Sequence, residues 1–237
     1  MTYRTVVPSR SWTTLTLEGV VIVLGIIIAL GAEALWDSSR DRRDEQVALR
    51  HLAEDFSKNA ARFDAAVAWH RGTRDATLVL MQSPAAGQVL ESDSLRVLVR
   101  RITDWWTFDP SDGALESLLY SGQFALIQDD SLRLELAAWP GLLRDYKEEE
   151  DGIGAVSMGF QRDYLVYHLD YGALYLPEIA GEDLGLGELV SGPIFRNFIA
   201  RRYSWMPDLL AEAETVRISL QRIRTLIDRN LEVGPGG

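Results

Sequence analysis

The sequence contains no cysteine and only three histidines in 237 residues. Without cysteine there is no disulfide, thiol nucleophile, iron–sulfur cluster or cysteine-ligated zinc. The histidines form neither an HExxH motif nor a two-histidine ligand pair, so a transition-metal site lacks its usual donors. We therefore expect no metal site and no cofactor. Because His70 shares a helical stripe with Phe56 and Phe63, we expect it in the core or at an interface.

Positive charge is also scarce. The chain has 24 Lys and Arg against 35 Asp and Glu, which gives a net charge of −11 at pH 7. A field of this sign repels the phosphates of DNA and RNA. We expect no nucleic-acid partner.

The motifs of common enzymes are missing as well. The sequence has no GxSxG, no GxxxxGK[ST] and no GxGxxG after a strand. The densest acid cluster, Asp145 with residues 148–151, is interpreted as a solvated helix end, since consecutive acids on a helix point in different directions. We expect no catalytic residue and no enzymatic activity. A hydrolase built from dispersed carboxylates is the alternative, because spacing alone selects no pair among 35 acids.

What the chain does contain is one long apolar run, Leu15–Trp36, about the length of a helix that crosses a ~30 Å hydrocarbon layer. Glu18 and Glu33 bracket its uncharged centre. The run is either a single-span anchor or a secretory signal cleaved near 32–34. We favour the anchor, because the chain continues without Gly or Pro as far as Gly72. The expected domains are a tail at 1–14, an anchor at 15–36 and an extramembrane domain at 37–237.

The anchor carries features of a membrane helix. Trp12 and Trp36 lie at its two ends, where indole rings prefer the membrane interfaces. Gly25 and Ala29 form a small-xxx-small pair that would let another membrane helix approach, although small residues are also ordinary in an anchor. We therefore expect contact with the lipid bilayer and with other membrane proteins.

Two charge patterns favour opposite orientations of the expected span in the membrane. The arginines after the anchor outnumber those before it and favour a cytoplasmic main domain; they are Arg40, Arg42, Arg43 and Arg50 against Arg4 and Arg10. In contrast, no acid precedes Glu18, whereas the later arginines are interleaved with acids at i, i+3 and i, i+4 spacing. The composition leaves both orientations open.

Helical periodicity dominates the rest of the chain. We expect helices at 37–83, from Asp93, at 114–120, from Asp129 or Asp130 with a break or kink at Pro140, at 152–175, and from Pro207 to the end, with loops at 83–87 and 177–192. Strand signals are almost absent. The sequence predicts an all-α protein, an antiparallel helical bundle whose first helix continues into the membrane.

Aromatic residues mark a candidate partner interface. Its members are Trp105, Trp106, Tyr164, Tyr167, Tyr171 and Tyr175, of which the tyrosines step by three, four and four residues along the helix expected at 152–175. Aromatic side chains supply large contact areas at interfaces, but the same residues would also line a ligand cleft or pack a core. These three interpretations remain open.

Two segments carry a family resemblance: LEGVVIVLGIIIALGAEALWD followed by LRHLAEDFSKNAARF, and later GALESLLYSGQFALIQDDSLRLELAAWPGLLRDYKEEED. Over about residues 15–150 the chain resembles a widespread family of uncharacterised bacterial single-span membrane proteins, with an ExxxVxxGI-type span, a long helix and a helical domain. The resemblance implies the bacterial inner membrane with the main domain on the periplasmic side. It supplies no catalytic residue to carry over.

These observations favour a membrane-anchored accessory or scaffold subunit that binds and stabilises a larger respiratory, photosynthetic or envelope complex. One span provides no transport path, while long apolar stripes and aromatic groups provide faces for binding. The alternative is a periplasmic sensor whose aromatic cleft takes a small ligand, but a tail of about fourteen residues is short for an output domain.

Overall fold

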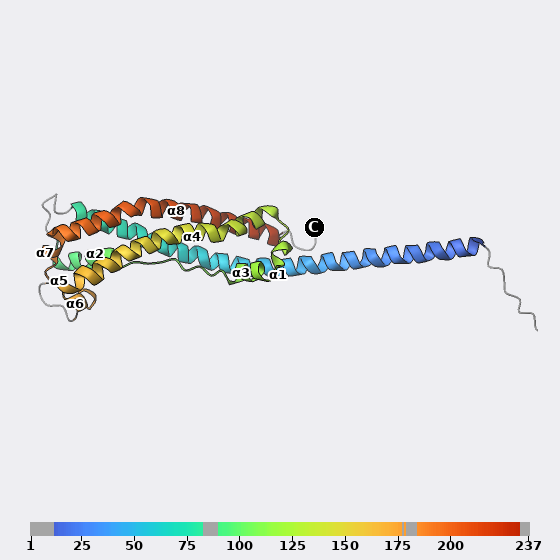
Figure 1. Ribbon diagram of the computed structural model, residues 1–237, viewed down its shortest axis with the longest axis horizontal. Coiled ribbons are helices and arrows are strands. Elements are labelled where there is room, and N and C mark those ends of the chain that lie inside the picture. Colours follow the sequence, from blue (N-terminus) through green and yellow to red (C-terminus); the bar gives the residue numbers. More distant parts are fainter. Residues whose placement is uncertain (1–11, 83–89, 177, 179–183, 233–237) are drawn as a thin grey trace, which may run out of the picture.

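The computed structural model describes residues 12–82, 90–176, 178 and 184–232. Of these residues 89% are helical and none lies in a strand, which confirms the all-α prediction. The helices form an elongated bundle from which one long helix projects (Figure 1). We name the end of the bundle where this helix leaves the proximal end, and the opposite end the distal end.

The projecting helix is α1, Trp12–Gln82, a single element of 71 residues and about 106 Å. No described side chain between Leu17 and Asp44 is buried. The part from Val20 includes an 18-residue window of mean hydropathy 2.2, none of it buried. This helix is therefore long and apolar enough to cross a membrane, and from Glu45 onward it packs into the bundle.

In the bundle, α1 packs against α4 (Asp130–Phe160). Phe56 contacts Trp139 with ring centroids 5.2 Å apart, and Phe63 contacts Tyr146 at 5.4 Å. Both partners advance by seven residues from one contact to the next, so the two helices run in the same direction. The seven-residue step is two helical turns, which keeps successive aromatic pairs on one face.

The third long helix, α8, Pro193–Glu232, runs antiparallel to both. Gln46 donates to the Asn230 carbonyl at the proximal end, while Asp64 pairs with Arg217 further along. The residue number rises on one helix as it falls on the other. The predicted antiparallel packing of the first and last helices is therefore confirmed.

Short elements close the two ends of the bundle. At the distal end lie α2 (Ser92–Thr103), the π-helical turn η2 (Gln161–Leu165), α5 (Val166–His168), α6 (Tyr171–Tyr175) and α7 (Leu186–Ser191). From α2 the chain returns along the bundle to α3 (Gly113–Tyr120) and the 3₁₀ turn η1 (Gln123–Leu126) at the proximal end (Figure 1). Gly122, between α3 and η1, has a φ of 74°, which glycine adopts without strain.

Two predicted helix breaks are absent. Pro140 neither interrupts nor ends α4, because the buried neighbours Leu136 and Trp139 hold this stretch against α8 and α1. Gly152 does not separate two helices either; the ring of Trp205 occupies the place where a Cβ would stand. Tertiary packing overrides the local preference of both residues.

Three other boundaries in the structure differ from the predicted ones. The last helix begins at Pro193, whose missing N–H costs nothing at a first helical position, and Pro207 lies inside it. The N-cap of α2 is Glu91 rather than Asp93, which lies in the first turn. The loop predicted at 177–192 includes α7, and the loop predicted at 83–87 lies outside the described residues.

Candidate functional site

The predicted tyrosine stripe is divided by the fold. Leu169, at φ −136° and ψ 157°, ends α5, so Tyr171 and Tyr175 belong to a separate helix, α6. Tyr164 stacks on Phe160 at 5.3 Å, whereas Tyr167 is 78% exposed. The four residues therefore do not form one helical face, and the prediction of a single stripe is wrong.

A polar cluster nevertheless joins α6 to the end of α2. The Tyr175 hydroxyl donates to the Asp104 carboxylate at 2.6 Å, and Arg100 lies 3.7 Å from the other carboxylate oxygen. Burial, together with the hydrogen bond to Asp104, raises the pKa of Tyr175 above its ordinary value. Tyr171 donates to Gln161, which in turn donates to the Thr103 carbonyl at 2.9 Å. These bonds fix the chain immediately before Trp105 and Trp106.

A buried arginine supports the same segment from the other side. Arg202 of α8 is 1% exposed; it donates to the Asp104 carbonyl at 2.8 Å and to the Ser157 hydroxyl. Burial lowers its pKa to about 10, so the guanidinium stays protonated near neutral pH. Sequence reasoning did not single out Arg202, because the helix expected from Pro207 excluded it.

A buried pair of a histidine and a glutamate lies midway along the bundle. His70 Nε2 is 3.0 Å from Glu150, and the Phe108 N–H donates to the same carboxylate at 2.9 Å. Glu150 is 2% exposed, so its assignment to a solvated helix end is wrong. The signal was present in the periodicity, since Glu150 lies four residues after the buried Tyr146. Burial, with Glu150 beside it, raises the pKa of the Tyr146 hydroxyl.

An apolar hollow at the distal end lies between α1 and α2. This hollow, which we name the distal groove, has a volume of about 590 Å³ and is lined by Trp69, Gly72, Asp75, Ala76, Val79, Val97, Leu98, Arg100, Arg101 and Asp104. Val97 is 64% exposed within it. Trp106 extends this surface, with its ring 5.6 Å from that of Trp69.

Most charged side chains that line the distal groove form ion pairs, but one arginine does not. Asp75 is paired with Arg74 at 2.9 Å, while Arg100 is paired with Asp104. Arg101 has no carboxylate partner among the described residues. Its guanidinium lies 4.0 Å from the Trp69 ring centroid and donates to the Trp69 carbonyl. The groove thus presents an ordered cation beside exposed apolar side chains.

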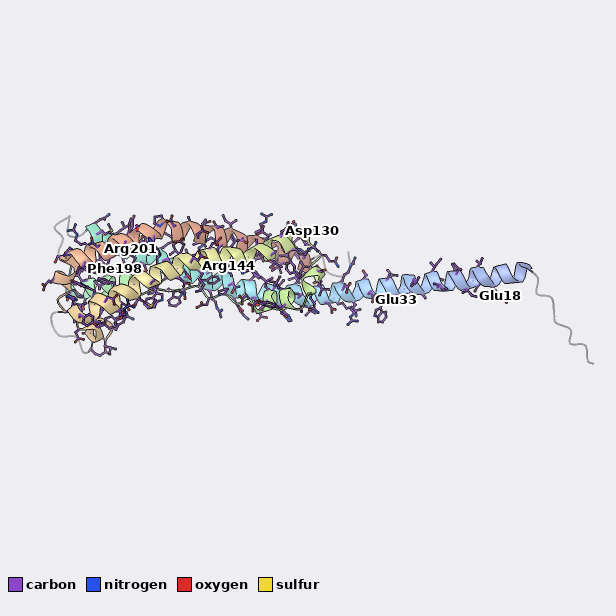
Figure 2. The ribbon with its side chains drawn as sticks, in the orientation of Figure 1. Glu18, Glu33, Asp130, Arg144, Phe198 and Arg201 are labelled. Atoms are coloured by element: carbon purple, nitrogen blue, oxygen red, sulfur yellow. The ribbon has the colours of Figure 1, made fainter. Side chains whose placement is uncertain are left out.

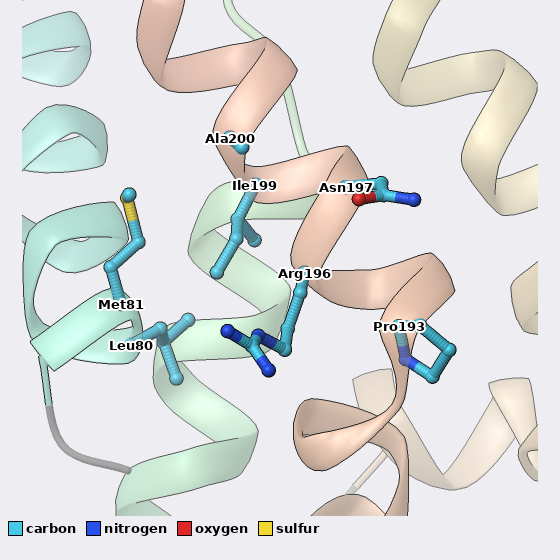
Figure 3. A pocket seen from close by; sticks show the side chains of 7 residues that line it. All are labelled: Leu80, Met81, Pro193, Arg196, Asn197, Ile199 and Ala200. Carbon is cyan, nitrogen blue, oxygen red and sulfur yellow. The ribbon is translucent and has the colours of Figure 1, made fainter. Parts of the chain in front are cut away.

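A second hollow of about 580 Å³ lies between the end of α1 and the start of α8. Figure 3 shows Leu80 and Met81 of α1 facing Ile199 and Arg196 of α8. Phe198 and Arg201, labelled in Figure 2, lie in the same part of α8. Arg196 is exposed, and this hollow lacks the tryptophans of the distal groove.

The predicted anchor residues lie on the projecting part of α1. Gly25 and Ala29 are exposed, and no atom lies within 4 Å of a Cβ built on Gly25. Trp36 is exposed, whereas the Trp12 side chain lies outside the description. Figure 2 places Glu18 and Glu33 on this helix, away from the bundle.

Within the described ranges no group of three His, Asp or Glu side chains is placed to hold a metal ion. No family model, curated protein or solved structure matches the chain. The resemblance to bacterial single-span proteins therefore stays a prediction.

Proposed function

We propose that this chain is a single-span, membrane-anchored accessory or scaffold subunit that binds a larger membrane complex through the distal groove and has no catalytic activity of its own. The observation that carries the proposal is the combination of an exposed apolar helix at one end and an aromatic groove with an uncompensated cation at the other. The bundle between them separates the two binding ends.

The distal groove has the composition of a binding surface. Partly exposed Trp106 and Val97 offer apolar area whose burial contributes about 1–2 kcal/mol per large side chain. Tryptophan and arginine are the residue types that most often dominate interface energies. Arg101 is already held by Trp69, so an acidic group of the partner would order it at little entropic cost.

The test is copurification from membranes with matched groove variants. The full chain is extracted in mild detergent, separated by native electrophoresis and analysed by mass spectrometry. We expect a stoichiometric large complex that Val97→Glu disrupts, because the new charge would be buried unpaired. Leu134→Glu is the control, since Leu134 is exposed on α4 outside the groove. A lone monomer, or a complex unchanged by Val97→Glu, would contradict the proposal.

We also propose the bacterial inner membrane as the location, with the bundle on the periplasmic side. The family resemblance and the purely basic segment before Glu18 support this orientation, although the arginine count favours the reverse. Alkaline phosphatase and fluorescent-protein fusions at Gly237 decide between the two. An active phosphatase fusion with a dark fluorescent one is expected, and the opposite pair would reverse the assignment.

A further inference from the structure

The proximal end of the bundle carries an uncharged corner formed by the end of α3, Gly122 and η1. We name residues 117–128 the proximal corner; they include no Asp, Glu, Lys or Arg, although 25% of the chain is charged. Its tip exposes 86% of Tyr120 and 41% of Leu119. Leu119 and Tyr120 therefore form a small exposed apolar tip within an uncharged segment.

The corner extends along α1 toward the anchor. Asp55 accepts a hydrogen bond from the Ala114 N–H at 3.0 Å near the start of α3, and Glu45 accepts one from the Gln128 N–H at 2.7 Å just after η1. The corner therefore reaches the level of Glu45, nine residues or about 13 Å beyond Trp36 on the straight helix. Figure 1 shows the short helical elements of this region at the base of the projecting helix.

The membrane surface lies close to this level. An indole prefers the membrane interface, so we take Trp36 as the boundary of the hydrocarbon layer; the 20 residues 17–36 then span its ~30 Å. The headgroup layer adds roughly 5–8 Å on each side, and membrane helices tilt by about 20° on average. On an untilted helix the level of Glu45 then lies about 5–8 Å beyond the headgroup layer, and a tilt toward α3 brings the proximal corner closer to the headgroups.

We propose that the proximal corner docks on the bilayer surface beside the anchor, with Leu119 and Tyr120 in the headgroup region. This inference rests on the membrane anchor of the proposed function. Tyrosine prefers the interface because its ring is apolar and its hydroxyl polar, and an uncharged corner loses no charge solvation there. A second contact fixes the tilt and rotation of the bundle, and therefore the height at which the distal groove is presented.

The chain's lack of cysteine permits a direct test with single spin labels. The full chain is reconstituted in phosphatidylcholine vesicles with a label at Ser121→Cys in the corner, Ile27→Cys in the anchor or Tyr167→Cys at the distal end. All three positions are exposed. The accessibility of each label to oxygen, which concentrates in the membrane, is divided by its accessibility to a water-soluble nickel chelate.

We expect the highest ratio at residue 27, a low ratio at 167, and a ratio at 121 several-fold above that at 167. Adding Tyr120→Asp is expected to lower the ratio at 121 to that at 167 and to leave residue 27 unchanged.

Three outcomes would overturn the inference. Equal ratios at 121 and 167, with residue 27 in hydrocarbon, would reject docking while the anchor stands. A label at 121 that is shielded from both reagents would show a protein contact or a second copy instead. A water-like ratio at residue 27 would reject the anchor, and docking with it.

Discussion

At the residue scale, the buried Glu150 is a carboxylate on which two other buried groups depend. It accepts from the Phe108 N–H and pairs with His70, and neither partner has another described acceptor nearby for these groups. Removing one member of a buried pair leaves the others desolvated and unpaired, which costs about 3 kcal/mol. The cost arises from the groups left behind, so it depends on whether a substitution keeps an acceptor.

We predict that Glu150→Ala lowers the free energy of unfolding by about 3 kcal/mol and that Glu150→Gln, which keeps an acceptor, costs less. The matched control is Glu148→Ala, an exposed acid two residues away, with an effect below about 0.5 kcal/mol. Urea unfolding of the detergent-solubilised chain, followed by circular dichroism, measures all three. Equal midpoints for the two alanine variants would contradict the role of the pair.

Asp129 makes part of the stability depend on pH. Hydrogen bonds from Asn230, then from the Leu132 N–H and Arg229, lower its pKa from 3.8 to about 2. A carboxyl with a lowered pKa stabilises the fold above its ordinary pKa, and this contribution is lost as the pH falls through about 2. With solvent screening the contribution is about 1 kcal/mol.

Asp129→Asn is therefore expected to destabilise the bundle by about 1 kcal/mol at pH 7, and by progressively less between pH 4 and pH 2. The amide keeps an N-cap for α4, so the loss reports the charge. Asp130→Asn is the control, because Asp130 is 82% exposed and contributes little through its pair with Arg133. Thermal unfolding at several pH values tests this; a pH-independent difference would refute it.

At the element scale, two glycines of α4 differ in what surrounds them. A Cβ on Gly152 would lie 1.8 Å from the Trp205 ring, whereas nothing lies within 4 Å of one on Gly141. Alanine is the better helix former by about 1 kcal/mol where space allows. The same substitution should therefore have opposite signs at the two positions.

We predict that Gly152→Ala destabilises the bundle by about 1–3 kcal/mol, because Trp205 must move, and that Gly141→Ala stabilises it by up to about 1 kcal/mol. Denaturant unfolding of both variants in the same detergent measures the difference. If Gly152→Ala is as stable as Gly141→Ala, α4 and α8 are less closely packed there than the structure shows.

Some boundaries of these elements could be predicted from the sequence, and others could not. The end of α1 near residue 82, α3 and the Asp129 cap were predictable, because periodicity and caps are local signals. The helix starts predicted at Gly152 and Pro207 were wrong. Whether a helix continues through such a residue depends on its packing against neighbours that are distant in the sequence. The distal groove was not predicted: of the candidate interface residues, Trp106 and Tyr175 contact its lining, whereas Trp69 and Arg101 are brought together only by the packing of α2 on α1.

At the scale of the whole molecule, the apolar projecting part of α1 and the bundle are joined by uninterrupted helix. Glu45, the first buried residue among those described, lies nine residues or about 13 Å beyond Trp36. The projecting part of α1 shares no core with the bundle, whose main cluster on this helix begins at Leu49. The proposed membrane attachment and the stability of the bundle therefore depend on different parts of one helix.

Removing residues 1–36 is expected to release the chain from membranes while changing the free energy of unfolding of the bundle by less than about 0.5 kcal/mol. The reason is that no described side chain from Leu17 to Trp36 is buried, so the deletion removes no core contact. Flotation with vesicles and urea unfolding measure the two properties on one sample. Retained flotation would place the main membrane affinity in the bundle, and a lost unfolding transition would show that the anchor is part of the fold.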